Sequence, residues 1–333
     1  MELVYLFLGA ALLGVTVVDL LWTTLWVEGS AGPLTARLMA WEWKGLRQIS
    51  DSHAKIRSLS GPLIFVSSLS VWIVLLWTGW TLVFASAQYP IFDTINGGPI
   101  SWSELVYFTG YSIFTLGNGD FAPRTGVWQI ATTLTAASGM LFVTLSVTYI
   151  LSVLDAVTQK RAFASGVSGL GMQSDEIILE SWDGDGFQSL DLPLTTITEQ
   201  LNTLASNHKA YPLLHYFHSE KATKAPTRSI AVLDETLLIL RFGIPESERP
   251  SNAILKNARA SVDNYLEVLS TAFIEPADQS PPPPDFGKIR DADIPTESDE
   301  VFEAAVDEVA HRRRALLGLV ESDVRQWPEN EDQ

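Results

Sequence analysis

Three long apolar runs constrain the fold of this chain more than any other feature of its sequence. They cover residues 3–27, 62–85 and 127–157, and a helix needs about 20 apolar residues to cross the hydrocarbon core of a bilayer. Because no water is available there, the backbone of each run must satisfy its own hydrogen bonds, which favours helices. The sequence therefore predicts an all-α membrane protein whose chain crosses the bilayer three times.

The polar remainder of the chain differs sharply in charge from this membrane part. Residues 156–333 contain 30 acidic and 16 basic residues, so they contribute −14 of the formal net charge of −17. An acidic surface repels phosphate backbones, which argues against nucleic acid as a partner. Residues 192–205, 230–242 and 254–273 place apolar side chains at helical spacing. We therefore expect a separate α-helical soluble domain after the membrane part.

The basic residues predict the orientation in the membrane. Five of them lie between the first two runs, and Lys160 and Arg161 follow the third, whereas residues 86–126 contain only Arg124. Basic residues favour the cytoplasmic side. We therefore expect a multi-pass protein of the plasma membrane with an external N-terminus and a cytoplasmic C-terminal domain. The connector at residues 29–60 has the composition of an amphipathic helix at a membrane surface. We expect a cytoplasmic connector held against the headgroups, which is favoured over a role in coupling to the gate.

A short glycine-containing segment between the second and third runs carries the chemistry. Its residues are Thr115, Leu116, Gly117, Asn118, Gly119 and Asp120. Alternating glycines allow successive backbone carbonyls to turn toward one axis, and four copies would make rings of oxygen that replace the hydration shell of a cation. Ser101 and Glu104 have capping-box spacing, which predicts a helix from there through Phe114. The negative end of that helix would face the cation.

This arrangement resembles the pore module of the potassium channel family over residues 61–157: outer helix, re-entrant pore helix, selectivity filter and inner helix. The usual filter of the family is Thr-Val-Gly-Tyr-Gly-Asp. The resemblance implies a homotetramer in a lipid membrane that conducts monovalent cations. It also implies K⁺ ions as permeant ligands, with no other cofactor, at the backbone carbonyls of Thr115, Leu116, Gly117 and Asn118 and at the Thr115 hydroxyl.

The filter departs from the family pattern at Asn118, where an aromatic residue is usual, and Phe114 stands where a threonine is common. A small polar residue at position 118 can cost outer ion sites and admit sodium, although Asn118 can also bond Tyr111 or a neighbouring subunit. We expect K⁺ selectivity, with a non-selective Na⁺/K⁺ channel as the alternative. A membrane-anchored signalling or scaffold protein with an inactive pore is the alternative from another class. No nucleophile–base pair or phosphate loop is evident, so no enzyme is expected.

Four residues of the third run are candidates for gating. Gly139 lies 19 residues beyond Asp120, where the inner helices of potassium channels often bend, and close helix packing is the competing role. Val147 and Leu151 are candidates for an apolar gate that closes by dewetting. Asp155 would add a ring of four carboxylates at the inner mouth, although an ordinary solvated helix end explains it equally well.

Composition divides the chain into five segments. An N-terminal helix with its connector covers residues 1–60, the pore module 61–160, and a cytoplasmic helical domain 161–275. A proline-rich linker covers residues 276–297, and a charged C-terminal helix covers 298–333.

Several polar residues outside the filter have competing roles. Asp19 lies inside the first run, where a hydrogen bond to a neighbouring helix or a position near the headgroups is favoured over a direct functional role. His208, His215 and His218 are expected to be packed histidines rather than a zinc site or a pH sensor, because no carboxylate has a suitable spacing. Asp183-Gly184-Asp185-Gly186 is expected to be a turn. Arg312, Arg313 and Arg314 are expected to form a solvated basic patch.

Overall fold

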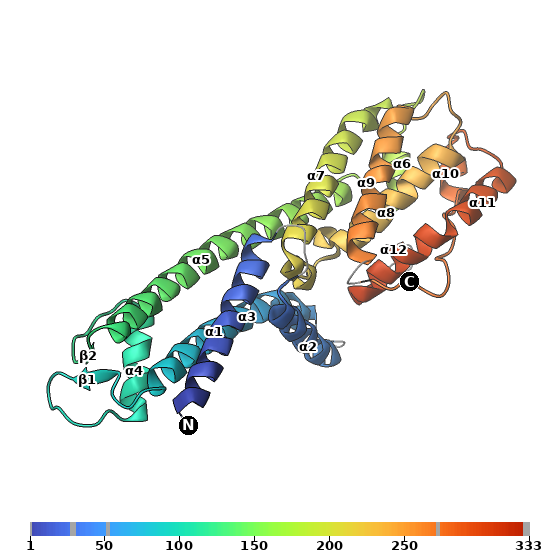
Figure 1. The fold of residues 1–333 in the computed structure, drawn as a ribbon. Helices are drawn as coiled ribbons and strands as arrows, with labels where there is room; N and C mark the ends of the chain where they lie inside the picture. The colour runs from blue at the N-terminus through green and yellow to red at the C-terminus, as the bar shows by residue number, and fades with distance from the viewer. Residues whose placement is uncertain (1, 27–30, 51–53, 271–273, 329–333) are drawn as a thin grey trace. The chain divides into compact units, whose positions relative to one another are not determined.

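The computed structural model describes residues 2–26, 31–50, 54–270 and 274–328. Its elements are shown in Figure 1. The chain divides into two compact units. The first, here called the membrane unit, comprises Met1–Lys44 and Pro62–Val153. The second comprises Gly45–Gly61 and Leu154–Gln333 and is called the cytoplasmic unit after the location that the sequence predicts for it. Parts of the predicted connector, residues 29–30 and 51–53, lie outside the described residues.

Helices build the membrane unit, as predicted. They are α1 (Glu2–Leu25), the first part of α2 (Pro33–Ser50), most of α3 (Ala54–Ala85), α4 (Trp102–Ile113) and the first part of α5 (Val127–Ser168). Three of them, Glu2–Leu25, Ser58–Ala85 and Val127–Ser168, are long and apolar enough to cross a membrane. The all-α membrane fold is therefore confirmed. The described residues contain two short strands, β1 (Ile91–Asp93) and β2 (Phe121–Pro123), which pair antiparallel.

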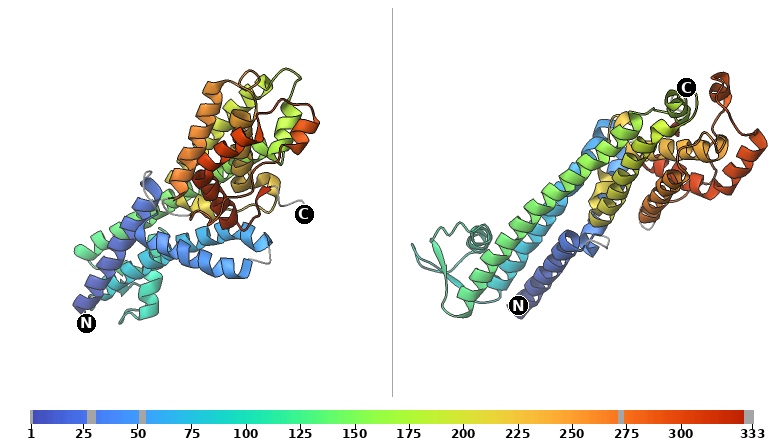
Figure 2. Two further views of the ribbon diagram at one scale, coloured as in Figure 1. Left: turned by 90° about the vertical axis from the view of Figure 1, so that its right-hand side faces the viewer. Right: turned by 90° about the horizontal axis from the view of Figure 1, so that it is seen from above.

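The core of the membrane unit lies where α1, α3, α4 and α5 meet. Trp72 and Leu76 of α3 pack with Leu20 of α1, Ile113 of α4 and Phe142 of α5, and all five side chains are buried. Figure 2 shows α3 and α5 lying side by side, and the ring of Phe65 on α3 meets that of Tyr149 on α5 edge to face. The pore helix α4 is thereby held by apolar contacts on both flanking helices.

Asp19 connects the first three helices. Its carboxylate is fully buried and accepts hydrogen bonds from the backbone N–H of Leu34 (2.8 Å), the indole Nε1 of Trp72 (2.8 Å) and both the N–H and hydroxyl of Thr35. Leu34 and Thr35 belong to the first turn of α2, where backbone donors lack partners within the helix. Asp19 therefore caps α2 from a distance, in agreement with the expected hydrogen bond to a neighbouring helix.

The cytoplasmic unit is a helical assembly. Its longest helices, α7 (Asp191–Ala210) and α9 (Asn252–Ser270), pack along each other, and α8 (Pro226–Leu238) packs against α6 (Ser174–Ser181), α9 and α12 (Ala310–Ser322). Short elements complete it: η1 (Gln188–Leu190), η2 (Pro212–Tyr216), η3 (Ala222–Lys224), the π-helix η4 (Ile239–Gly243), α10 (Gly287–Asp291) and α11 (Asp299–Glu308). The single charged helix expected near the C-terminus is two helices, because the helical backbone is interrupted at Val309.

The expected solvated basic patch is wrong for two of its three arginines. Arg313 is almost fully buried and forms a two-bond ion pair with Glu235 (2.9 and 3.2 Å), and it also donates to the carbonyls of Pro281 and Pro282. Arg312 pairs with Asp234. A buried charge needs such partners because water no longer solvates it. The proline-rich segment is consequently anchored to α12.

Candidate ion-conduction site

The predicted pore helix is α4, and its capping box is confirmed. The Ser101 hydroxyl accepts from the N–H of Glu104 (3.3 Å), while the Glu104 carboxylate accepts from the N–H of Ser101 (2.7 Å). At the other end, Phe114 caps the helix and donates its N–H to the carbonyl of Gly110. The helix therefore starts and stops where its own sequence provides the capping groups.

The filter loop, residues 115–120, begins with two hydrogen bonds to the last turn of α4. The N–H of Thr115 donates to the carbonyl of Ser112 (3.1 Å), and the N–H of Leu116 donates to the carbonyl of Tyr111 (2.8 Å). These bonds satisfy two carbonyls that a helix end otherwise leaves open. They also fix the first filter residues directly beneath the negative end of the pore-helix dipole.

Every second residue of the filter loop has a positive φ. The values are 57° at Thr115, 60° at Gly117 and 83° at Gly119. Glycine adopts this conformation freely, whereas for a β-branched residue such as Thr115 it is an outlier that costs about 1–3 kcal/mol. Strain of this kind persists where surrounding structure and function require it. The alternation rotates successive peptide planes in opposite senses, so their carbonyls can face one side.

The outer end of the filter loop is tied to the loop before the pore helix. The N–H of Thr94 donates to the carbonyl of Asp120 (2.9 Å), and its hydroxyl donates to the carbonyl of Gly119 (2.7 Å). The strand pair β1–β2 lies directly beside these bonds. The Gly119 carbonyl is thus already engaged, which leaves the carbonyls of residues 115–118 as the predicted ion ligands.

Asn118 bonds a different tyrosine from the expected one. Its side-chain amide donates to the hydroxyl of Tyr107 (2.6 Å), whereas the hydroxyl of Tyr111 donates to the carbonyl of Phe121 (2.7 Å). Both tyrosines lie on α4, one turn apart. Asn118, the residue at which the filter departs from the family pattern, is therefore linked to the pore helix by a hydrogen bond in place of aromatic packing.

A cluster of aromatic rings packs behind the filter loop. Phe84 of α3 lies edge-on to Phe108 (ring centroids 5.2 Å apart) and beside Trp128 of α5 (5.7 Å), and Phe108 in turn meets Tyr111 (5.3 Å). Phe84, Phe108 and Tyr111 are buried. Such offset and edge-to-face pairs resist sliding. The cluster therefore holds α4 between the helices on either side of it.

Sequence reasoning missed two tryptophans of α3 that bond the neighbouring helices, one to α4 and one to α5. The indole of Trp77 donates to the carbonyl of Val106 (2.8 Å), and its ring lies edge-on to Phe114. Trp80 donates to the hydroxyl of Ser138 on α5 (2.9 Å). The signal that could have indicated them is their spacing, since positions 77, 80 and 84 share one helix face.

Gly139 lies against the end of the pore helix. A Cβ atom at this position would come within 2.0 Å of the carbonyl oxygen of Ile113. Only glycine permits this approach of two backbones. The structure therefore gives Gly139 a packing role, and its role as a hinge stays a prediction.

The face of α5 that carries the gate candidates Val147 and Leu151 is exposed on the single chain. Val147 and Leu151 are 50% and 64% exposed, and Met140 and Val143, which precede them on this face, are exposed as well. The opposite side of the helix is buried, with Phe142, Tyr149 and Val153 in the interior. Asp155 is exposed further along α5 and accepts a hydrogen bond from the side chain of Gln159 (2.7 Å).

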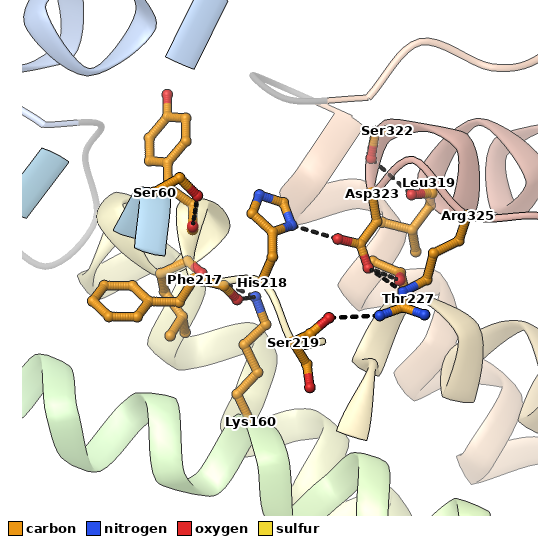
Figure 3. Close-up of polar contacts among 12 residues, drawn as sticks. Ser60, Lys160, Phe217, His218, Ser219, Thr227, Leu319, Ser322, Asp323 and Arg325 are labelled. Atoms are coloured by element: carbon orange, nitrogen blue, oxygen red, sulfur yellow. Dashed lines mark hydrogen bonds and ion pairs between the residues drawn. The ribbon is translucent and has the colours of Figure 1, made fainter. Parts of the chain in front are cut away.

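Within the cytoplasmic unit, one segment contacts both the start of α3 and the end of α5 (Figure 3). The buried ammonium of Lys160 on α5 donates to the carbonyls of Leu214 (2.9 Å) and Phe217 (3.0 Å). The hydroxyl of Ser60 on α3 donates to the carbonyl of Tyr216 (3.0 Å). We call residues 212–218 the coupling segment.

The coupling segment ends in a histidine–carboxylate pair that was not expected. His218 pairs through Nδ1 with Asp323, which also accepts from the hydroxyl of Thr227 (2.7 Å) and from Arg325 (3.2 Å). Burial by itself raises the pKa of Asp323, but the hydrogen bond and charge of His218, together with Arg325 and Thr227, outweigh it and hold the pKa below its usual value. The expectation that these histidines lack a carboxylate partner is wrong for His218.

Of the other two histidines, His208 is buried and His215 is partly exposed. Burial, with the nearby charge of Lys160, lowers the pKa of His208 to about 3. The pKa of His215 is lowered well below its ordinary value for the same main reason, burial. His208 packs edge-on against Tyr265. Within the described ranges, no group of three or more His, Asp or Glu side chains is arranged to hold a metal ion.

The Asp183–Gly186 sequence is a turn. The Asp183 carboxylate accepts from the N–H of Asp185 (2.9 Å) and of Gly186 (2.8 Å). This is the local hydrogen bonding by which aspartate stabilises turns.

Comparison with known proteins identifies the class. Residues 69–156 match the family described as ion channel, and this range contains α4, the filter loop and most of the apolar parts of α3 and α5. The resemblance predicted from the sequence is confirmed at this level. The chain carries an ion channel domain in an all-α membrane protein.

The match to a curated protein extends over nearly the whole chain. It is 44% identical over 327 residues to the uncharacterized membrane protein YdjJ of Bacillus subtilis (strain 168), with 98% of this chain and 96% of that protein covered. The chain therefore belongs to the same family as that membrane protein. No solved structure matches the chain significantly.

Proposed function

We propose that this chain forms a homotetrameric K⁺-selective channel of the plasma membrane, with an external N-terminus and a cytoplasmic C-terminal unit. The observation that carries the proposal is the alternating backbone of the filter loop, with positive φ at Thr115, Gly117 and Gly119, placed at the end of a capped helix. This backbone can present successive carbonyls to a dehydrated cation.

A fourfold assembly follows from what one chain lacks. Each chain supplies one filter loop, and a ring of carbonyls around an ion needs several. The filter residues 115–119 are exposed on the single chain, and so are the apolar side chains of Val147 and Leu151 on α5. Closed rotational symmetry would cover both at once.

The hydrogen bond from Asn118 to Tyr107 supports selectivity for K⁺. A selective filter must keep its outer carbonyls in place, and the usual aromatic residue does this by packing on the pore helix. Asn118 reaches the same helix by a direct bond. We infer that this bond replaces the missing packing.

The coupling segment is the proposed route of gating. It binds Ser60 at the start of α3 and Lys160 at the end of α5, so a change in its position acts on the outer and inner helices together. Val147 and Leu151 on α5 are the proposed apolar gate, and Asp155 is proposed to concentrate cations next to it.

The test is ion flux into liposomes that contain the purified full chain, under K⁺ and Na⁺ gradients in turn. We expect uptake with K⁺ alone and a tetrameric mass in detergent. The control is Gly117→Ala, which forces a side chain into a conformation with φ of +60° and should abolish flux. Equal uptake of both ions would assign the chain as a non-selective channel. If neither ion moved, the channel itself would be refuted and the scaffold alternative would replace it.

A further inference from the structure

A basic cleft lies on the cytoplasmic unit, away from the coupling segment. Its volume is about 510 Å³, which is within the usual range for small-molecule sites. The side chains that matter for its chemistry are those of Arg241, Phe242, Arg249, Lys256 and Glu297. The first two come from the π-helix η4, Arg249 from the following loop, Lys256 from α9, and Glu297 from the segment before α11.

The π-helix places two of these residues in the cleft. It spans Ile239–Gly243 and closes with a wide-turn bond from the N–H of Ile244 to the carbonyl of Ile239 (3.1 Å). Single π-turns are rare and occur frequently at functional sites, because the extra residue redirects side chains. Here Arg241 and Phe242 are the residues in the middle of the turn.

The cleft concentrates positive charge in an otherwise acidic domain. Arg241 and Lys256 are exposed, and within the described part of the chain neither forms an ion pair. Arg249 faces Glu297 only at 3.9 Å and donates its Nε to the carbonyl of Ile244. The lining therefore carries three cations against one carboxylate. Like charges gathered in this way repel one another unless an anion joins them.

A fourth cation lies directly behind the cleft. The guanidinium groups of Arg241 and Arg259 both lie over the ring of Phe242, at 5.2 and 5.5 Å from its centroid. Burial, together with the charges of Arg312 and Arg241, lowers the pKa of Arg259. Two guanidiniums on one ring show that positive charge is crowded here.

The start of α9 also lies at the cleft. Asn252 is the first residue of this 19-residue helix and lines the cleft. The unpaired N–H groups of a helix N-terminus carry partial positive charge and favour anions. Part of this end is already bonded: the N–H of Ser251 donates to the carboxylate of Asp191 (3.3 Å), and the side chain of Asn252 donates to that of Glu246 (3.0 Å). The positive charge of the cleft therefore comes from Arg241, Arg249 and Lys256.

We propose that this cleft binds a soluble small molecule that carries phosphate groups. Arginine guanidiniums match phosphate oxygens in pairs, and lysine adds a compact charge. The volume suits a ligand of several linked groups rather than a lone anion. The site deepens the proposed function, on which its regulatory meaning rests: such a ligand would be the signal that the cytoplasmic unit receives.

Calorimetric titration of the full chain with sodium pyrophosphate tests the binding directly. The protein is kept in a neutral detergent, so that no lipid phosphate competes. We expect saturable binding that weakens as the NaCl concentration rises. Arg241→Gln and Lys256→Gln should each weaken it at least about tenfold, as expected when one charge-assisted hydrogen bond is lost. Lys209→Gln, at an exposed position on α7, is the matched control and should bind like the unaltered chain.

Two outcomes of this titration would overturn the proposal. One is the absence of binding up to millimolar pyrophosphate, and the other is equal binding by the Arg241→Gln, Lys256→Gln and control chains. We expect both variants to fold, because the altered side chains are exposed, and thermal melting of each variant checks this. A second arm adds phosphatidylglycerol to the detergent: displacement of pyrophosphate would assign the site to lipid headgroups instead. Because no flux is measured, the binding result stands apart from the fate of the channel proposal.

Discussion

The side-chain amide of Asn118 lies 2.6 Å from the hydroxyl of Tyr107, so the one unusual residue of the filter is bonded to the helix that supports it. Tyr107 also packs edge-on against Tyr111 and Phe121. A single hydrogen bond therefore connects the outer filter to the aromatic cluster behind it.

Removing this bond should loosen selectivity. A hydrogen bond of this kind contributes about 0.5–1.5 kcal/mol, so Tyr107→Phe should lower the K⁺/Na⁺ permeability ratio by roughly threefold to tenfold. Bi-ionic reversal potentials measure this ratio. Tyr89→Phe, a tyrosine outside the filter whose ring lies beneath Arg124, is the control. An unchanged ratio in Tyr107→Phe would show that Asn118 does not depend on its partner, and Asn118→Tyr should then change little as well.

Gly139→Ala should disrupt the pore unit. The added methyl group would lie 2.0 Å from the carbonyl oxygen of Ile113, so α4 and α5 would have to separate. We expect a lower melting temperature and loss of flux together. Gly14→Ala is the control, because nothing lies within 4 Å of a Cβ at that position. A variant that melts normally but fails to open would instead support the hinge.

Asp19→Ala should destabilise the protein strongly. Its carboxylate accepts from Leu34, Thr35 and Trp72, and the donors of Thr35 and Trp72 would be left buried without a partner. We expect a loss of at least about 3 kcal/mol in unfolding free energy, seen as a fall in melting temperature in detergent. Trp72→Phe removes one donor only and should cost less. If it costs as much as Asp19→Ala, the carboxylate is not the centre of the network.

Lys160→Met should alter gating without altering selectivity. It removes both hydrogen bonds to the coupling segment, to Leu214 and Phe217, while the filter loop is untouched. Single-channel recording should show a changed open probability at an unchanged reversal potential. Lys209→Met, at an exposed site, should match the unaltered chain. A shift of reversal potential in Lys160→Met would contradict the proposed separation of gate and filter.

The free energy of unfolding should decrease as the pH is lowered, because His208 is buried in its uncharged form. Its pKa is lowered to about 3 in the folded chain, whereas the unfolded chain takes up the proton near its ordinary value. The stabilisation is therefore fully present above about pH 6.5 and is lost as the pH falls below it, by about 1.4 kcal/mol for each pH unit down to about 3. His208→Phe should remove this contribution from the slope of melting temperature against pH. An identical slope in the variant would contradict the assignment.

The filter and its helix could be predicted because their determinants are local. The glycines at positions 117 and 119 and the capping box at Ser101 act within a few residues, so the pattern specifies the conformation. The partner of Asn118 could not be chosen in advance, since Tyr107 and Tyr111 lie one turn apart on the same helix. Which of the two tyrosines bonds Asn118 depends on how each packs against other elements.

The ion pairs of the cytoplasmic unit depend on distant residues. His218 and Asp323 are 105 positions apart, and no local pattern connects them. Arg313 did carry a signal: it lies three and seven positions before Leu316 and Val320 on one helix face. Asp234 and Glu235, which lie inside an apolar helix, were the second signal in the sequence, because buried acids need cationic partners.

The buried carboxylate of Asp19 also constrains how the membrane unit is assembled. All of its observed donors lie on α2 and α3, which leave the ribosome later than α1. A carboxylate in hydrocarbon without donors is costly, so α1 cannot settle until the chain up to Trp72 has been made. Of these three helices, the one that is synthesised earliest is therefore the one that must wait for the other two.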